Sequence, residues 1–279
     1  MQFCRFDRPD ALRQWIGSAG LPFSLSSWLE CAPAGRPLDQ WAKPEPITLP
    51  PPSERTPLAA CYFDVDGTLV KTNLVHPTLY YLVNQGTPLQ TAKRIGRALF
   101  GAPRMAFAEM VDRRTFNELL FASYAGMSED RMVLLAKDAF ENVMLPSLFP
   151  AAKGLIEKSR AAGHDVVLIS GALEIVLEHT ARFLGAQEVI GNRLEMKAGI
   201  ATGKLLKPVV AGPEKARLIR EHAKLRGYDL AECFAFSDSY SDVPMLSVVG
   251  HPAAVNPDKR LALLAKAYSW PSFDLNHPQ

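Results

Sequence analysis

Short apolar runs alternate with amphipathic segments over much of the chain. The runs LAACYFDV (58–65), DVVLIS (165–170) and CFAFSD (233–238) have the length and the apolar content of buried strands. AAKGLIEKSRAAG precedes the second run and PEKARLIREHAKLRG precedes the third, and both have the apolar spacing that is typical of helices. Strands that alternate with helices predict an α/β fold, a doubly wound parallel sheet with a Rossmann-like core.

Two stretches interrupt this alternation. Residues 191–206, GNRLEMKAGIATGKLL, alternate around Lys197-Ala198-Gly199 and predict a β-hairpin. Between Leu69 and about Pro150 the patterns are helical, and the expected helices lie in residues 76–86, 89–100, 114–126 and 128–144. We expect an inserted helical cap here, because lids commonly close over sites from which water must be excluded.

The chain before the first strand has a different character. Six prolines between Pro44 and Pro57 predict an extended, semi-rigid linker, and a helical pattern at residues 10–20 precedes it. We therefore divide the chain into three parts. These are an N-terminal extension with a Pro-rich linker (1–57), an α/β core (58–72 and 150–279) and a helical cap (73–149).

Composition and charge narrow the function classes. Of 279 residues, 48% are apolar and 22% charged, and the net charge of +2 with no long basic stripe argues against a nucleic-acid partner. The cysteines (Cys4, Cys31, Cys61 and Cys233) are widely spaced, which favours reduced thiols and a cytoplasmic location. We expect no transmembrane helix, because no apolar run reaches about 18 residues.

Each of the three expected strands ends in polar residues. The first ends in Asp64-Val65-Asp66, the second in Ser170-Gly171 and the third in Ser237-Asp238. Ligands of open α/β sheets bind at the carboxyl ends of the strands. The sequence therefore predicts that these three stretches converge on one site.

The pair Asp64 and Asp66 admits three interpretations. Asp and Gly are common in turns, so an acidic turn is one of them. A calcium loop is another, but it needs a third oxygen ligand where Thr68 and then Leu69 stand. The third, which we favour, is a carboxylate nucleophile beside a carboxylate that transfers protons, with Mg²⁺ to offset the two charges.

Further candidates follow later in the chain. Asp238 and Asp242 are four residues apart, either in an acidic surface turn or completing an oxygen-rich Mg²⁺ site. Ser170 and Gly171 precede a helix, where they suit either a simple cap or a phosphate site. Lys215 lies in the first turn of a helix, where the helix dipole disfavours a cation. It is either solvated or placed there to reach a phosphate.

These motifs together resemble the haloacid dehalogenase superfamily. D-x-D-G-T at Asp64, the strand-end Ser170-Gly171, the helix-borne Lys215 and the D-x-x-x-D loop at Asp238 occur in the order of that family. The cap between the first and second motifs, the sequence GNRLE with its hairpin, and GHPAAVNPDKRL resemble the phosphoserine-phosphatase-like branch. The resemblance covers residues 58–279.

The resemblance implies a phosphatase with a Mg²⁺ cofactor and an aspartyl-phosphate intermediate. Asp64 would attack phosphorus, Asp66 would act as acid and then base, and Lys215 would neutralise charge. The remaining implied roles are phosphate binding by Thr68, Ser170 and Gly171, and Mg²⁺ binding by Asp64, the Asp66 carbonyl and Asp238, with support from Asp242. The expected partner is a small-molecule phosphate ester.

Two departures from the phosphoserine phosphatases leave the substrate open. Gly67 stands where those enzymes usually have Ser, and Asn73 where they have Glu. Cap residues Arg113, Arg114 and Tyr124 are candidates for substrate contact. A phosphotransferase or phosphomutase with the same intermediate, and a non-catalytic binding module, remain alternatives. The basic, apolar segment 92–110 also admits a membrane surface or lipid phosphate, although we favour a lid helix with solvated charges.

Overall fold

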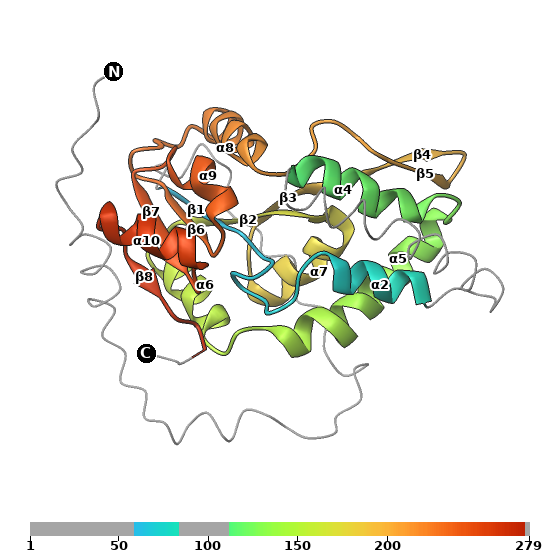
Figure 1. Cartoon of the computed structure of the whole chain (residues 1–279), viewed down its shortest axis with the longest axis horizontal. Coiled ribbons are helices and arrows are strands. Elements are labelled where there is room, and N and C mark those ends of the chain that lie inside the picture. Colours follow the sequence, from blue (N-terminus) through green and yellow to red (C-terminus); the bar gives the residue numbers. More distant parts are fainter. Residues whose placement is uncertain (1–58, 84–111, 277–279) are drawn as a thin grey trace.

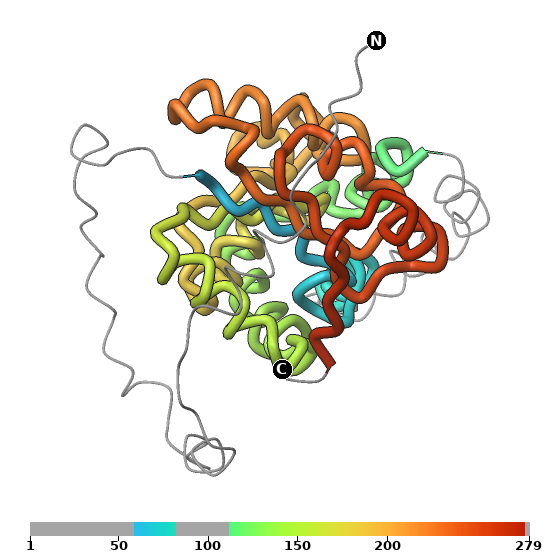
Figure 2. The backbone as a smooth tube through the Cα atoms, turned by 90° about the vertical axis from the view of Figure 1, so that its left-hand side faces the viewer, coloured from blue at the N-terminus to red at the C-terminus, as the bar shows by residue number. Residues whose placement is uncertain are grey.

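A parallel sheet forms the centre of the molecule. The computed structural model describes residues 59–83 and 112–276. Its six-stranded sheet has the order β3-β2-β1-β6-β7-β8, and all neighbouring strands are parallel (Figure 1). The strands are β1 (Ala60–Phe63), β2 (Asp165–Leu173), β3 (Glu188–Asn192), β6 (Phe234–Ser237), β7 (His251–Val255) and β8 (Ser272–Phe273). In the perpendicular view of Figure 2, β1 at the start of the blue tube lies between the orange and the yellow-green segments.

Helices cover both faces of this sheet. Because side chains alternate along a strand, Cys61 and Phe63 of β1 join one buried cluster and Ala60 and Tyr62 join the other. The first cluster includes α6 (Ala152–Ala161) and α7 (Glu174–Leu184). The second includes α8 (Pro213–Arg226), α9 (Val243–Leu246) and α10 (Lys259–Ala267). The predicted doubly wound α/β core is therefore confirmed.

The strand order reverses between β1 and β6. From β1 the chain adds β2 and then β3 on one side, and from β6 it adds β7 and β8 on the other. Such a switch point leaves a crevice at the carboxyl ends of the two central strands, where open α/β sheets bind ligands. Asp64 follows β1 and Asp238 follows β6, so the two residues meet at this crevice.

The segment between β1 and α6 is helical in its described part. It contains α2 (Val75–Val83), α4 (Arg113–Phe121), a 3₁₀ turn (Ala122–Tyr124), α5 (Glu129–Ala139), a π-helical turn (Phe140–Met144) and a second 3₁₀ turn (Leu145–Ser147). Asp112 caps α4 by accepting hydrogen bonds from the backbone N–H groups of Arg114 and Thr115. We call these elements the lid.

The predicted hairpin is present and packs on the lid. Its strands are β4 (Leu194–Lys197) and β5 (Ile200–Leu205), which pair antiparallel. The Gly126 N–H donates to Ala201 O at 2.8 Å, and the Ala201 N–H donates to Met127 O, also at 2.8 Å. The hairpin thus fastens lid residues with backbone hydrogen bonds, although it follows three strands of the core sheet in sequence.

The remaining predictions concern the cysteines, membrane-spanning helices and the N-terminal part of the chain. Cys61 and Cys233 are buried free thiols, as expected. No helix among residues 59–83 and 112–276 has the length and apolar character needed to cross a bilayer. The N-terminal extension, the boundary at residue 57, the segment 92–110, Cys4 and Cys31 lie outside the described residues.

Candidate active site

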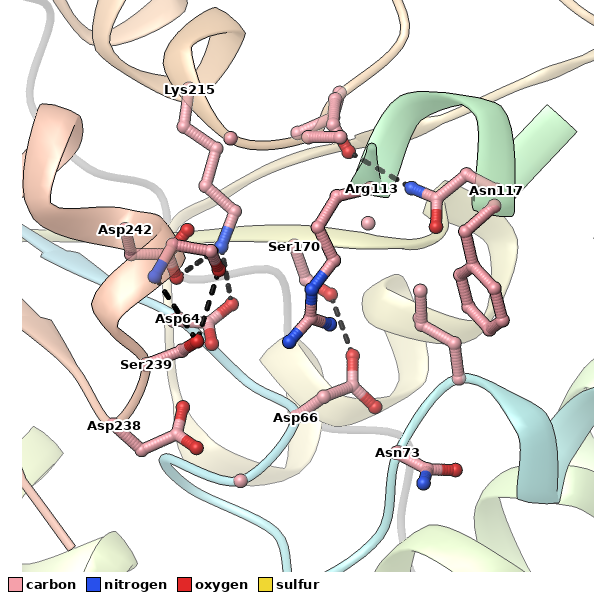
Figure 3. Close-up of a pocket in the computed structure, with 18 of the residues that line it drawn as sticks. Asp64, Asp66, Asn73, Arg113, Asn117, Ser170, Lys215, Asp238, Ser239 and Asp242 are labelled. Carbon is pink, nitrogen blue, oxygen red and sulfur yellow. Dashed lines mark hydrogen bonds and ion pairs between the residues drawn. The ribbon is translucent and has the colours of Figure 1, made fainter. Parts of the chain in front are cut away.

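Asp64 lies at the carboxyl end of β1, in the floor of a cavity of about 300 Å³. Its backbone N–H donates to Phe236 O of the neighbouring strand at 2.9 Å, which fixes the position of the residue. The side chain is 5% exposed, and its Oδ1 accepts a hydrogen bond from Lys215 Nζ at 2.7 Å (Figure 3). The predicted nucleophile is therefore held rigidly by backbone and side-chain contacts.

Lys215 joins two carboxylates that are far apart in sequence. Its Nζ lies 2.7 Å from Asp64 Oδ1 and 2.7 Å from Asp242 Oδ2, and the lysine is buried. Burial disfavours the ammonium, but the charges of Asp242 and Asp64 outweigh it and raise the pKa of Lys215. Its place in the first turn of α8, unfavourable for the helix dipole, is explained by these two partners.

Asp66 faces the second strand. Its Oδ2 accepts a hydrogen bond from Ser170 Oγ at 2.8 Å, while its buried Oδ1 has no hydrogen-bond partner in the described part of the chain. Burial, with the charge of Asp64, raises the pKa of Asp66 to about 7. A carboxyl group that titrates near neutral pH can donate a proton and take one back, which general acid–base catalysis requires.

Asp238 and Thr68 brace the two central strand ends. The Asp238 backbone N–H donates to Thr68 Oγ1 at 2.9 Å, and Thr68 Oγ1 donates to Asp238 Oδ1 at 3.0 Å. Burial and the nearby charge of Asp64 raise the pKa of Asp238 to about 7. The Thr68 hydroxyl thus links the ends of the two central strands through Asp238. Its expected role in phosphate binding stays a prediction.

Asp242 is oriented by a second hydroxyl group. Its Oδ2 accepts from Ser237 Oγ at 2.8 Å as well as from Lys215. This carboxylate therefore holds the lysine in place, and its expected support of a Mg²⁺ ion stays a prediction.

The structure places Ser170 and Gly171 differently from the sequence prediction. They lie within β2, where the pairing with β3 is irregular between Ile169 and Leu173, and α7 begins only at Glu174. The expected helix N-terminus is thus not at Ser170. The two residues still line the cavity, because the irregular strand end turns toward Asp66.

The site has the chemistry of a magnesium site, although no cluster of three His, Cys, Asp or Glu side chains forms a ready-made metal site within the described ranges. Asp64 and Asp238 supply carboxylates, and the strand-end loop supplies the Asp66 carbonyl. Mg²⁺ is commonly bound by one or two carboxylates, with substrate phosphate and water as the other ligands. Burial and the neighbouring Asp64 charge, which raise the pKa of Asp238, also make a cation favourable beside these carboxylates.

Gly67 is required by the approach of Asp238. Its φ is +82°, and a Cβ at this position would lie 2.2 Å from Asp238 Oδ2. The departure from the Ser of phosphoserine phosphatases thus has a steric cause in this chain. A side chain here would push the Asp238 carboxylate off Thr68 and away from the expected metal site.

We expect Gly67→Ala to raise the Mg²⁺ concentration needed for half-maximal activity about tenfold or more, because the displaced carboxylate is an expected ligand. Gly227→Ala is the matched control: its φ is +75°, so it carries the same backbone strain, but nothing lies within 4 Å of its added Cβ. Magnesium titrations of both variants provide the measurement. Equal shifts in the two would show that strain alone matters and that Asp238 does not depend on Gly67.

The lid contributes residues to the cavity wall. Arg113, the first residue of α4, and Asn117, one turn later, both line the cavity. Arg114 instead pairs with Glu118 at 3.3 Å. Tyr124 is 1% exposed and packs inside the lid, so of the three predicted cap candidates only Arg113 lines the cavity.

Asn117 and Asn192 are functional candidates that the sequence reasoning missed. Asn192 Nδ2 donates to Gly171 O at 2.7 Å, its Oδ1 accepts from the Val210 N–H at 2.8 Å, and Asn117 Nδ2 donates to Val210 O at 3.3 Å. The second strand, the lid and the segment before Lys215 are thereby joined. Asn117 could have been found in the sequence, because it is a polar residue on the otherwise apolar, buried face of α4, between Phe116 and Leu120.

A doubly wound sheet, a lysine-held aspartate at its switch point and a helical lid together indicate a hydrolase with an α/β core and a lid. The chain belongs to the haloacid dehalogenase-like hydrolase family, whose model matches residues 61–247. Within it the chain falls in the phosphoserine-phosphatase-like branch, among enzymes of the phosphatase class.

Relatives and solved structures agree with this assignment. An "inhibition of morphological differentiation protein" of Streptomyces azureus is 34% identical over 80% of each chain. A phosphoserine phosphatase of Mycobacterium tuberculosis is 30% identical over 84% of this chain and 79% of its own. The crystal structure of a Bordetella pertussis protein of unknown function has the same fold, with a TM-score of 0.68, 24% identity, and coverage of 79% of this chain and 100% of its own.

Proposed function

We propose that the protein is a Mg²⁺-dependent phosphomonoesterase that acts on a small organic phosphate through a phosphorylated Asp64. The observation that carries this proposal is the position of Lys215, whose ammonium joins Asp64 to Asp242 at 2.7 Å each. Burial raises the pKa of Asp64, and the ammonium opposes this shift by stabilising the carboxylate that attacks phosphorus. Phosphoryl transfer needs mainly positioning and charge neutralisation, and these contacts supply both.

The first half-reaction uses both aspartates of the strand end. Asp64 Oδ1 is bound to Lys215 at 2.7 Å, whereas Oδ2 accepts a longer hydrogen bond from Thr68 Oγ1 at 3.4 Å and is the oxygen that attacks phosphorus. As the bond between phosphorus and the ester oxygen breaks, protonated Asp66 gives its proton to the leaving oxygen. Ser170 and Lys215 face the phosphate on either side, where a hydroxyl and a cation stabilise its oxygens. Bound Mg²⁺, held by Asp64, Asp238 and the Asp66 carbonyl, would neutralise phosphate charge.

The second half-reaction reverses the role of Asp66. Its carboxylate, now deprotonated, takes a proton from a water molecule, and the water oxygen attacks the phosphorus on Asp64. The bond to Asp64 breaks and inorganic phosphate leaves. The buried, unpartnered Oδ1 of Asp66 is the atom that lies free to hold the proton in both steps.

The direct test is product analysis on a panel of amino-acid, sugar, amino-alcohol and lipid phosphates. Hydrolysis releases inorganic phosphate and free alcohol in equal amounts. A phosphotransferase would release the alcohol without phosphate when a second acceptor alcohol is present, and a phosphomutase would give an isomeric ester. Absence of all three products from the whole panel would contradict an enzymatic function for the site.

We expect removal of Mg²⁺ by a chelator to reduce phosphate release by at least about 10²-fold, because buried carboxylates then repel the phosphate dianion. Re-addition of Mg²⁺ should restore the rate. Ca²⁺, which takes six to eight ligands at longer distances, should restore it poorly. A rate that is the same with chelator and with Mg²⁺ would exclude the metal role of Asp238.

A further inference from the structure

The charges around the cavity are unevenly distributed. The carboxylates that line it are Asp64, Asp66, Asp238 and Asp242, and all four belong to the strand ends where the phosphate reacts. The lid wall opposite carries the cation Arg113 and the neutral amide of Asn117, with apolar surface from Phe116 and Leu74. The alcohol part of a substrate therefore meets a positively charged wall.

Arg113 is a lid cation whose charge acts on Asp66 but which has no hydrogen-bonded partner among the described residues. Among residues 59–83 and 112–276 it forms no hydrogen bond or ion pair, whereas its neighbour Arg114 is paired with Glu118. Figure 3 shows the Arg113 guanidinium group pointing toward Asp66 and Ser170, on the side where the leaving alcohol must lie. Guanidinium groups bind carboxylates with two parallel hydrogen bonds, so this side chain suits an anionic group on the alcohol.

Asn117 presents a buried acceptor. The residue is 2% exposed, its Nδ2 donates to Val210 O at 3.3 Å, and its Oδ1 has no hydrogen-bond partner in the part of the chain that the structure describes. Leaving a buried carbonyl oxygen unbonded is costly, so a ligand that brings a donor gains affinity there. The amide is neutral, and it accepts from a hydroxyl as well as from an ammonium group.

Among the described residues, the lid side of the cavity offers no Asp or Glu that could pair with an ammonium group of a substrate. Asn73 stands there, and its Oδ1 is already engaged by the Val75 N–H at 3.1 Å and by His76 Nδ1 at 2.9 Å. Lys71, another residue of the cavity wall, carries its ammonium over the ring of Phe149. In the described residues, the lid wall of the cavity thus carries positive and neutral side chains only.

We propose that the substrates are phosphate monoesters of small hydroxy acids, in which a carboxylate binds Arg113 and a neighbouring hydroxyl donates to Asn117 Oδ1. An amino group in place of that hydroxyl is accepted but not required. This inference rests on the proposed phosphomonoesterase activity. A cavity of about 300 Å³ is at the lower end for small-molecule sites, which fits a compact three-carbon acid.

Four related esters test the two contacts separately. We expect similar kcat/KM values, within about threefold, for 3-phosphoglycerate and O-phosphoserine, which differ only in hydroxyl against ammonium. Glycerol 3-phosphate lacks the carboxylate, and 3-phosphooxypropanoate lacks the donor. Each should be at least about tenfold poorer, because a charge-assisted bond or a buried acceptor is left unsatisfied.

Variants on α4 assign the effect to residues. In Arg113→Met the ratio of kcat/KM for 3-phosphoglycerate over glycerol 3-phosphate should fall to about one, and Arg113→Lys should restore part of it. Arg114→Met, the matched control on the outer surface, should keep the ratio of the unmodified protein. An unchanged ratio in Arg113→Met would overturn the proposal.

The outcomes separate this inference from the proposed function. Equal kcat/KM for all four esters, or O-phosphoserine more than tenfold better than 3-phosphoglycerate, would overturn the inference and leave the activity in place. So would cleavage of p-nitrophenyl phosphate together with no cleavage of the four. If neither the four esters nor p-nitrophenyl phosphate were cleaved, the proposed function itself would be contradicted.

Discussion

Phosphate release should fall by at least about 10³-fold when Asp64 is replaced by asparagine, because an amide cannot attack phosphorus. The substitution is nearly isosteric, and the backbone bond from residue 64 to Phe236 O is kept. The bond from Lys215 to residue 64 then goes to the neutral amide oxygen of asparagine, while the bond from Lys215 to Asp242 is unchanged. The loss should therefore appear in kcat and not as unfolding.

The measurement is the initial rate of phosphate release, together with mass spectrometry of protein quenched during turnover. The unmodified protein should carry one additional phosphoryl group, and Asp64→Asn should carry none. Asp130→Asn is the control, since Asp130 is an exposed residue in the first turn of α5. Equal rates for Asp64→Asn and the unmodified protein would falsify the nucleophile assignment.

The position of the candidate site residues could be predicted from the sequence because a local pattern encodes it. Asp64, Ser170 and Asp238 each follow or end a short apolar run, and the carboxyl ends of parallel strands lie at one edge of a sheet. The strands themselves were found for the same reason. The central strands are buried on both faces and therefore read as continuous apolar segments.

The outer strands and the lid contacts could not be predicted in the same way. β3 is only half-buried for most of its length, β7 begins with His251-Pro252, and β8 has two residues, so none of them forms a long apolar run. The sequence predicts on which face of α4 Arg113 lies, but it does not predict which residues or cavity that face contacts. Glycine is needed at position 67 because Asp238 lies against it, and Asp238 is distant in the sequence, so this contact could not be predicted.

Lys215→Met should abolish activity and also destabilise the fold, by about 3–5 kcal/mol in the free energy of unfolding, since it leaves buried carboxylates without their cation. Burial already raises the pKa of Asp64 in the unmodified protein, and loss of the lysine that opposes this shift raises it further above its value in the unfolded chain. A carboxyl group whose pKa is raised in the folded state favours folding most at a pH below its unfolded pKa. This contribution to stability is lost as the pH rises through the folded-state pKa. The deficit should therefore be largest near neutral pH and shrink toward pH of about 4.

Denaturant unfolding at several pH values measures this effect. Lys224→Met is the matched control, because Lys224 is exposed in the last turn of the same helix. It should change the free energy of unfolding by no more than about 0.5 kcal/mol. A pH-independent deficit in Lys215→Met would mean that lost packing of the lysine side chain, and not unpaired charge, is the cause.

The double variant Lys215→Met/Asp242→Asn separates the structural role of the lysine from its catalytic role. Removing one of the two stranded carboxylates should recover a large part of the lost stability, because residues in one ion-pair network are coupled and their effects do not add. Activity should stay low, since the phosphate and Asp64 still lack the cation that neutralises them. Recovery of phosphate release along with stability would show that Lys215 acts only by holding Asp242, and it would remove the lysine from the catalytic set.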